Sequence, residues 1–304
     1  MMNVALIGMG RWGAVLLRVL NERSRVRWVC NRKDQEALAR ATRRCPEARA
    51  TTKVEEVFGD AEVEAVVIAT PIATHAALAR QALEAGKHVF VEKPLTADPA
   101  EAYALVELAA RRRRTLFTGQ VFLYHPVFEK VRELTRDDPI SSAQMTWTQF
   151  GTFDEDLCWN FLPHPVSLAL ALFERAPSQA AVCHRQGMVT ACDVVAARLA
   201  FGADRECWIE ANRCAPTKTR RVTLTTASGR VLGWDGDALF RLEPGRPPEP
   251  LSVTGEEPLA RELDAFLEGA RSGRLLGQDP RHGAAVVEVI HELSGTQHGP
   301  VPCR

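Results

Sequence analysis

Three glycines near the amino terminus constrain the fold of this chain more than any other feature. Gly8, Gly10 and Gly13 directly follow the apolar run Val4–Ile7 and open a helical pattern that extends to about Asn21. The first glycine permits a tight turn, and the third permits close packing of the helix on the strand. The chain is therefore predicted to begin with a strand, a turn and a helix rather than with a secretory signal.

The next hundred residues continue this alternation of short apolar runs and helical patterns. Strands are predicted to end at Cys30, Ala69, Val91 and Thr118. Alternating strands and helices are typical of βαβ units that form a parallel sheet. Residues 1–122 are therefore predicted to form a Rossmann domain, a doubly wound parallel sheet that binds a dinucleotide.

A different pattern begins at residue 123. Extended segments follow one another with few helices between them: Val194–Phe201, Cys207–Ala211 and Arg221–Thr226. Such a series predicts an open, mostly antiparallel sheet. Residues 123–304 are therefore predicted to form an α+β domain for substrate binding and oligomerisation, with one helix around Phe161–Phe173.

The carboxyl-terminal part is predicted to contain a loop and two helices. The proline-rich segment Glu243–Pro250 has the composition of a loop. Helices are predicted near Glu257–Ala270 and Gly283–Leu293, and they are candidates to pack back on the Rossmann domain.

Composition points to an ordinary globular protein. The 304 residues are 46% apolar and 25% charged, with a formal net charge of zero, so charge gives no reason to expect nucleic acid or membrane partners. No segment approaches the roughly 18 apolar residues of a membrane span. The eight cysteines include no Cys-x-x-Cys pair, so we expect reduced thiols, no metal site and a cytoplasmic location.

The glycine turn also has the chemistry of a phosphate site. The second glycine lets a pyrophosphate approach the backbone, and the helix N-terminus supplies free N–H groups and a favourable dipole. Arg11 and Trp12, which lie between Gly10 and Gly13, are included in the predicted cofactor site. The alternative is a glycine-rich turn without a ligand.

The end of the second strand bears on the choice between the two nicotinamide cofactors. The sequence Asn31-Arg32-Lys33 offers an amide for the ribose and two cations for a 2′-phosphate. Asp34 is interpreted as the N-cap of the next helix. NADP is therefore favoured, with NAD as the alternative, and the alternative for Arg32 and Lys33 is a solvated turn.

A lysine follows the buried strand Val89–Val91, in the sequence Glu92-Lys93-Pro94. Pro94 prevents the strand from continuing. Ligands of open α/β sheets bind at the carboxyl ends of the strands, so Lys93 is well placed for chemistry. The alternative is a solvated lysine at a strand end.

Together these segments resemble the Gfo/Idh/MocA family of oxidoreductases. The resemblance rests on Gly8-x-Gly10-x-x-Gly13, on Ala69-Thr70-Pro71 with His75, and on the run from Ala85-Gly86-Lys87-His88 to Lys93-Pro94-Leu95. It implies a Rossmann domain, a second domain on an open sheet, and a nicotinamide between them. It also implies hydride transfer with sugars, sugar nucleotides, cyclitols or related carbonyl and imine compounds.

The resemblance assigns roles to residues of the first domain. Lys93 matches the family's active-site lysine, which can donate a proton to the substrate oxygen. Glu92 would orient Lys93 or contact the cofactor, and Thr70 and Pro71 would line the nicotinamide. His75 would lie nearby, or alternatively would be a helix N-terminal histidine satisfied by the backbone.

In the second domain the family often has Asp-x-x-x-His at the start of a helix. Here His164 matches the histidine, but Asn160 replaces the aspartate, and Pro165 stands where some relatives carry an acid. An amide can orient an imidazole but cannot stabilise its charged form as a carboxylate does. His164 is therefore either the acid/base group or a substrate-binding residue, and Asn160 would also contact substrate.

Other residues compete for the same proton. Tyr124 can donate to a developing alkoxide, or it is a structural residue where the two domains meet. Asp154 and Asp156 are interpreted as solvated loop acids.

The sequence thus predicts an NAD(P)-dependent oxidoreductase that uses NADPH to reduce a ketone or imine on a small polar metabolite. The alternative is a catalytically altered nicotinamide-binding protein that acts as a non-redox sensor or assembly protein. We also expect a homo-oligomer through the second sheet, where Trp147, Trp208 and Trp234 are predicted to form one packed face.

Overall fold

The computed structural model describes residues 1–274 and 277–295. The chain forms two compact units. The first contains Met1–Val121 and Glu257–Val287, and the second contains Phe122–Glu256 and the chain from Glu288 onward. Helix α10 (Pro280–Gly295) begins in the first unit and ends in the second.

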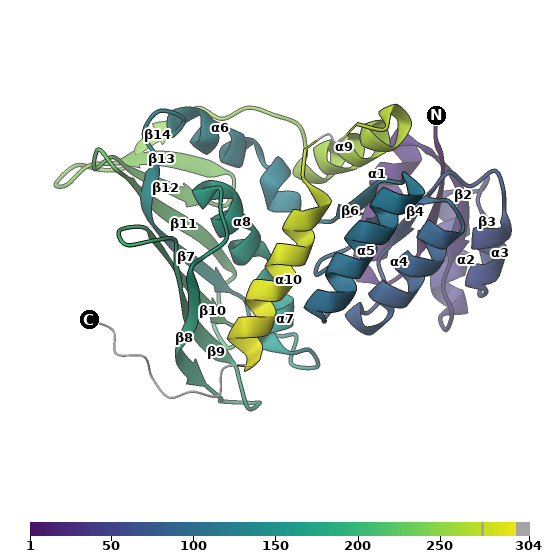
Figure 1. The fold of residues 1–304 in the computed structure, drawn as a ribbon, viewed down its shortest axis with the longest axis horizontal. Coiled ribbons are helices and arrows are strands. Elements are labelled where there is room, and N and C mark those ends of the chain that lie inside the picture. The colour runs from purple at the N-terminus through teal and green to yellow at the C-terminus, as the bar shows by residue number, and fades with distance from the viewer. Residues whose placement is uncertain (275–276, 296–304) are drawn as a thin grey trace. The chain divides into compact units, whose positions relative to one another are not determined.

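The first unit is built on a six-stranded sheet with the order β3-β2-β1-β4-β5-β6 (Figure 1). All neighbouring strands pair in parallel. The strands are β1 (Asn3–Ile7), β2 (Arg25–Cys30), β3 (Arg49–Thr51), β4 (Ala65–Ile68), β5 (His88–Val91) and β6 (Leu116–Thr118). The central strand β4 is buried along its whole length, as expected for a parallel sheet covered on both faces. The predicted Rossmann fold is confirmed.

Helices cover this sheet. They are α1 (Arg11–Arg23), α2 (Gln35–Arg44), α3 (Val54–Gly59), η1 (Ile72–Thr74), α4 (His75–Glu84), α5 (Pro99–Arg112) and α9 (Pro258–Ser272). In the sheet's helical layers α4 packs on α5, and α1 packs on α9 (Figure 1). The predicted N-cap Asp34 accepts from the Ala37 amide at 2.8 Å, so this helix start is confirmed. Asp98 caps α5 in the same way and accepts from the Glu101 amide at 3.0 Å.

The second unit is built on an eight-stranded sheet with the order β14-β13-β12-β11-β7-β10-β9-β8 (Figure 1). Its strands are β7 (Ile140–Thr148), β8 (Gln179–Gln186), β9 (Val194–Ala200), β10 (Glu206–Asn212), β11 (Thr219–Thr226), β12 (Val231–Asp235), β13 (Ala238–Leu242) and β14 (Glu249–Leu251). Strands β7 and β10 pair in parallel and the other neighbours pair antiparallel. The prediction of a mostly antiparallel sheet is confirmed.

One local prediction in this unit is wrong. Residues 249–250, expected in a loop, begin strand β14 at the sheet edge, where Pro250 is tolerated because one side of the strand needs no hydrogen bond. The helix predicted around Phe161–Phe173 is confirmed as α8 (Pro163–Phe173), which starts at a proline whose missing N–H is not needed there. The short helix α7 (Leu157–Phe161) precedes it. Before them come η2 (Val121–Tyr124) and α6 (Pro126–Leu134).

The three tryptophans do not share one face of the sheet, which corrects the prediction. Trp147 and Trp234 are 1% and 3% exposed and both pack on Phe122, at ring-centroid distances of 5.2 and 6.2 Å. Trp208 lies opposite Gln144, three residues from Trp147, so the alternation of the strand places it on the other face. There its indole N–H donates to Glu206 at 3.0 Å.

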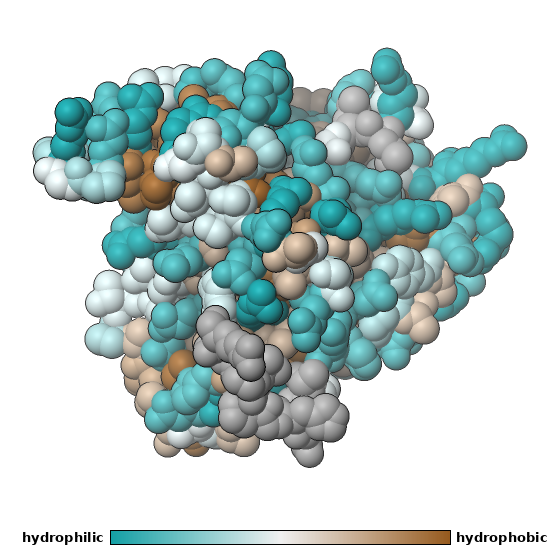
Figure 2. Space-filling model, turned by 60° about the vertical axis from the view of Figure 1, so that its left-hand side comes forward, coloured by the Kyte–Doolittle hydropathy of each residue, from teal (hydrophilic) through white to brown (hydrophobic). Residues whose placement is uncertain are grey.

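One face of the molecule is mainly polar. On the face shown in Figure 2, hydrophilic residues predominate and hydrophobic residues form small scattered groups. Among the described residues, no helix is long and apolar enough to span a bilayer.

Candidate functional site

The glycine turn between β1 and α1 is packed at its two ends and open in the middle. Gly8 has φ +100°, and a Cβ there would lie 2.3 Å from the Ala69 carbonyl oxygen. A Cβ on Gly13 would lie 2.0 Å from the Gly8 carbonyl oxygen. A Cβ on Gly10, in contrast, would meet nothing within 4 Å. The middle glycine therefore leaves room for a ligand to approach the backbone.

Helix α1 presents free N–H groups at this opening. Its N-cap is Gly10, and no side chain caps it. The first intrahelical bond runs from the Ala14 amide to the Gly10 carbonyl at 3.1 Å, so the amides of residues 11–13 point out of the helix. A hollow of about 460 Å³ lies beside the turn, lined in part by Met9, Gly10, Arg11, Asp34 and Arg40. Free amides, a helix dipole and arginines fit the diphosphate of a dinucleotide.

The residues after β2 brace the turn. The Asn31 side chain accepts from the Met9 amide at 3.2 Å and donates to the Asp34 carbonyl at 3.1 Å. Arg32 and Lys33 are exposed and, within the described ranges, form no ion pair. A ribose contact by Asn31 and phosphate contacts by the two cations stay predictions.

Glu92 connects the turn to the end of β5. Its carboxylate, 9% exposed, accepts from the Trp12 indole N–H and from the Lys93 amide, the latter at 3.2 Å. Burial raises the pKa of Glu92 to about 7, although the Trp12 hydrogen bond and the Lys93 charge act in the opposite direction. Lys93 itself is half-buried and is followed by a cis peptide bond to Pro94.

His75 joins the loops that follow β4 and β5. The ring is 1% exposed, with Nδ1 2.9 Å from the Pro94 carbonyl oxygen and Nε2 2.7 Å from the Thr70 carbonyl oxygen. Burial lowers its pKa. Both ring nitrogens are engaged with backbone, which matches the structural alternative for this residue. Thr70 accepts from the Thr74 hydroxyl at 2.8 Å and Pro71 is exposed, so these two remain the candidates for nicotinamide contact in this loop.

A second buried carboxyl, absent from the sequence-based predictions, lies near Glu92. Glu262 of α9 is 1% exposed and accepts from the Gln120 amide. Burial, with the nearby charge of Glu92, raises its pKa well above the ordinary value. A signal was present, because position 262 shares a helix face with Leu259 and Phe266, and a glutamate on an apolar face is unusual.

In the second unit, the candidate residues lie on three short elements. His164 is the second residue of α8, and its ring contacts Phe122 of η2 edge-on at 4.9 Å between centroids. Asn160 lies on α7, and Tyr124 closes η2. Asp156 is exposed just before α7, as interpreted, and it also caps that helix by accepting from the Cys158 and Trp159 amides at 2.9 and 3.2 Å. Asp154 is exposed, as expected.

The sequence of the first unit matches a known family. Residues 2–120 match a family described as "Oxidoreductase family, NAD-binding Rossmann fold", the Gfo/Idh/MocA family. This region belongs to the Gfo/Idh/MocA oxidoreductases. The resemblance seen in the sequence is therefore confirmed. The prediction of NAD or NADP as the cofactor is confirmed as well.

Two curated relatives match part of the chain. UDP-N-acetylglucosamine 3-dehydrogenase of Acidithiobacillus ferrooxidans is 34% identical over 139 residues, 43% of this chain and 44% of that protein. A dTDP-3,4-didehydro-2,6-dideoxy-alpha-D-glucose 3-reductase of Streptomyces violaceoruber is 40% identical over 127 residues, 38% of this chain and 36% of that protein. The matched stretches thus span less than half of each relative.

Solved structures extend the likeness of fold to both units. The structure of the Acidithiobacillus ferrooxidans enzyme covers 96% of both chains with a TM-score of 0.88 and 24% identity. A 3-ketoreductase from Actinomadura kijaniata, solved in complex with NADP, covers 96% of both chains with a TM-score of 0.85 and 19% identity. At these identities the structures establish the two-domain fold.

Proposed function

We propose that this chain is an NAD(P)-dependent oxidoreductase that reduces a carbonyl group on a nucleotide-linked sugar, with NADPH as the preferred reductant. The observation that carries the proposal is the link between the open Gly10 N-cap and the Glu92–Lys93 strand end, made by the Trp12–Glu92 hydrogen bond. A dinucleotide whose diphosphate lies on the turn extends along the carboxyl edge of the sheet, toward that strand end.

Different residues of the first unit bind the cofactor, hold the site in place and donate the proton. When bound, the nicotinamide supplies the hydride. The amides of residues 11–13 bind the diphosphate, and Glu92 holds Trp12 and the Lys93 backbone in place. The Lys93 ammonium donates a proton to the substrate oxygen as the carbonyl becomes a hydroxyl.

Charge around the turn supports NADPH over NADH. Asp34, the acid nearest the expected ribose, is engaged as the N-cap of α2 and lies 3.7 Å from the Arg40 guanidinium. Arg11 and Arg40 line the adjacent hollow, and Arg32 and Lys33 are exposed beside it. Arg40 also pairs with Glu36 at 3.0 Å. The remaining cations Arg11, Arg32 and Lys33 favour a 2′-phosphate over a free ribose hydroxyl.

The second unit supports reduction rather than oxidation. His164 and Tyr124 are the candidates to share the proton chemistry with Lys93. Asn160 stands in place of the aspartate that would stabilise a charged imidazole, so His164 lacks that carboxylate support for base catalysis. Carbonyl reduction needs an acid donor, so it is less affected by this replacement than alcohol oxidation.

Both curated relatives are named for reactions at position 3 of a nucleotide-linked sugar, which suggests the substrate class. The test is to mix the purified chain with NADPH or NADH and a panel of UDP- and dTDP-linked keto sugars, and to follow loss of the reduced nicotinamide. We expect turnover with at least one keto sugar, faster with NADPH. Efficient oxidation of sugar alcohols with NADP⁺, with keto sugars inert, would contradict the proposed direction.

One observation favours a second candidate function, a nicotinamide-binding protein without redox turnover. It is the amide of Asn160 in place of the family's carboxylate. This candidate predicts tight NADPH binding with no turnover across the whole panel. In either case a homo-oligomer through the second sheet stays a proposal, which sedimentation velocity of the purified chain tests.

A further inference from the structure

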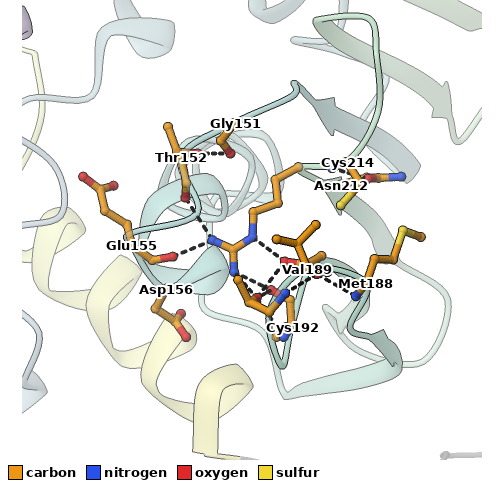
Figure 3. A network of polar contacts seen from close by, with 12 residues as sticks. Gly151, Thr152, Glu155, Asp156, Met188, Val189, Cys192, Asn212 and Cys214 are labelled. Atoms are coloured by element: carbon orange, nitrogen blue, oxygen red, sulfur yellow. Dashed lines mark hydrogen bonds and ion pairs between the residues drawn. The ribbon is translucent and has the colours of Figure 1, made fainter.

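Two loops of the second unit share one buried cation, Arg213, which lies just after β10. Its Nε donates to the fully buried Asp193 carboxylate at 2.9 Å. Other nitrogens of the guanidinium donate to the carbonyls of Glu155 and Cys192, each at 2.6 Å, so the segment before α7 is joined to the connection between β8 and β9 (Figure 3). The positive charge of Arg213 is therefore matched by a carboxylate inside the protein.

Arg220, the second residue of β11, is held in a different way. Its Nη1 donates to the carbonyls of Thr148 and Thr219 at 2.7 and 2.8 Å. Its Nη2 donates to the side-chain oxygen of Gln149 at 3.2 Å. All three acceptors are neutral, and over residues 1–274 and 277–295 no carboxylate forms an ion pair with this guanidinium.

Two aromatic rings flank the same guanidinium. Its Cζ lies 5.5 Å from the centroid of the Trp147 ring and 5.8 Å from that of Phe161, which directly follows Asn160 on α7. The negative faces of such rings attract a cation without neutralising it. Burial lowers the pKa of Arg220 to about 10, and no carboxylate acts in the opposite direction. The side chain is thus a half-buried positive charge that no described residue balances.

The guanidinium also keeps hydrogen-bond donors in reserve. An arginine has five N–H donors, and the carbonyls and the amide described above use three of those of Arg220. Nε makes no hydrogen bond to any residue that the structure describes. Nε and Nη2 form the edge of a guanidinium that matches two oxygens of one phosphate. Arg220 therefore has both the charge and the donors to bind an anion.

A row of rings leads from Arg220 to a candidate substrate residue. Trp147 of β7 lies opposite Arg220 in the sheet and packs on Phe122 at 5.2 Å between ring centroids. Phe122 in turn contacts the His164 ring at 4.9 Å. Two aromatic side chains therefore separate the balancing charge that Arg220 lacks from the imidazole that is a candidate to contact the sugar.

We propose that Arg220 binds the diphosphate of the nucleotide-linked sugar and so positions the sugar near His164. This inference rests on the proposed function, because it assigns a residue to the charged part of that substrate class. A diphosphate accepts two parallel N–H···O bonds from one guanidinium. The bonds to the Thr148 and Thr219 carbonyls hold the guanidinium in place before the substrate arrives.

The test measures binding of UDP and dTDP to the full-length chain by isothermal titration calorimetry, with excess NADP⁺ present so that the cofactor site is filled. Uridine and thymidine, which lack the phosphates, are titrated in parallel. Wild type should bind at least one of the diphosphates. Arg220→Met keeps an apolar stem between the two rings and loses the charge, so it should weaken that binding by roughly 10- to 100-fold. Its binding of the nucleosides should equal that of wild type.

Two further variants make the test specific. Arg220→Lys keeps the charge without the planar fork, so it should restore part of the binding that Arg220→Met loses. Arg221→Ala is the matched control, since the neighbouring Arg221 pairs with Asp235 at 2.6 Å, and it should bind the diphosphates like wild type. Circular dichroism shows whether each variant is folded. Arg220→Gln, whose amide can still donate to the carbonyls, replaces Arg220→Met if the sheet is disturbed.

The outcomes separate this inference from the proposed function. The assignment of Arg220 would be overturned if wild type bound neither diphosphate, if a folded Arg220→Met bound them as tightly as wild type, or if Arg221→Ala lost as much, even where keto sugar nucleotides are reduced. Binding that depends on Arg220, in a chain that reduces no keto sugar, would support the assignment and contradict the oxidoreductase function. Where turnover occurs, Arg220→Met should raise the KM for the keto sugar nucleotide by a similar factor and change kcat less.

Discussion

The first unit places its candidate residues at the ends of parallel strands, whereas the second places them on short helices whose surroundings are fixed from far along the chain. The glycine turn follows β1, Thr70 follows β4, and Lys93 follows β5. In the second unit the segment before α7 is held by Arg213, 58 residues beyond the Glu155 carbonyl that it binds. The positions of the strand-end residues follow from the order of the strands in the sheet. The position of the segment before α7, in contrast, depends on the guanidinium of Arg213.

The largest expected effect is a fall in kcat when Lys93 at the end of β5 is replaced. Lys93→Ala should lower kcat by about 10²- to 10⁴-fold, the usual contribution of a positioned acid, with little change in NADPH affinity. His164→Ala, the matched variant in the second unit, should lose clearly less because Asn160 gives its imidazole no charge support. Steady-state kinetics and NADPH titration measure both. An equal loss of kcat in His164→Ala and Lys93→Ala would contradict the larger role proposed for Lys93.

Arg213→Ala should affect stability more than any other change in the second unit. It leaves the buried Asp193 carboxylate unpaired, at a cost of about 3–5 kcal/mol. Arg221→Ala removes the Asp235 ion pair, whose side chains are 59% and 44% exposed, and should cost less than about 1 kcal/mol. Urea unfolding measures both, and equal losses would show that Arg213 does not organise these loops.

Alanine substitutions at two glycines of the turn are expected to have opposite effects, one on stability and the other on cofactor binding. Gly13→Ala places a Cβ 2.0 Å from the Gly8 carbonyl oxygen and should destabilise the protein by about 1–3 kcal/mol. Gly10→Ala meets no atom within 4 Å, so stability should hardly change. Its methyl group would occupy the proposed diphosphate site and should weaken NADPH binding by roughly 10-fold or more. Unchanged NADPH affinity in a folded Gly10→Ala variant would contradict binding of the diphosphate at this turn.

The last expected effect is a dependence of the free energy of unfolding on pH. Because the folded-state pKa of Glu92 is raised to about 7, its contribution to stability is full below the unfolded value and is lost as pH rises toward 7. Relative to Glu92→Gln, wild type should lose on the order of 1–3 kcal/mol between about pH 4.5 and 7. Thermal unfolding across this range measures the difference, and parallel curves for the two proteins would contradict the burial of an ionisable carboxyl here.

The sequence was most informative where chemistry depends on local geometry. Turn and packing requirements predict the places of Gly8 and Gly13, and the backbone contacts bear them out. Position alone predicts Asp34 as a cap, which its hydrogen bond confirms. Lys93 was placed from a strand end and a proline. These inferences needed only residues close together in the chain.

The rest depended on distant partners. Glu262 contacts the Gln120 amide across 142 positions, and no local pattern names that partner. The Arg213–Asp193 pair joins residues 20 positions apart, and no local pattern predicts it. Trp208 was placed on the wrong face because the register between β7 and β10 decides which tryptophans share a side.

Transfer of a labelled hydride tests the central claim most directly. NADPH deuterated at C4 of the nicotinamide would be incubated with the chain and an active keto sugar nucleotide, and the product sugar analysed by mass spectrometry. We expect one deuterium on the carbon that bore the carbonyl when the transferred face carries the label, and almost no product in Lys93→Ala. Product that contains no deuterium with either labelled face would contradict hydride transfer from the bound nicotinamide.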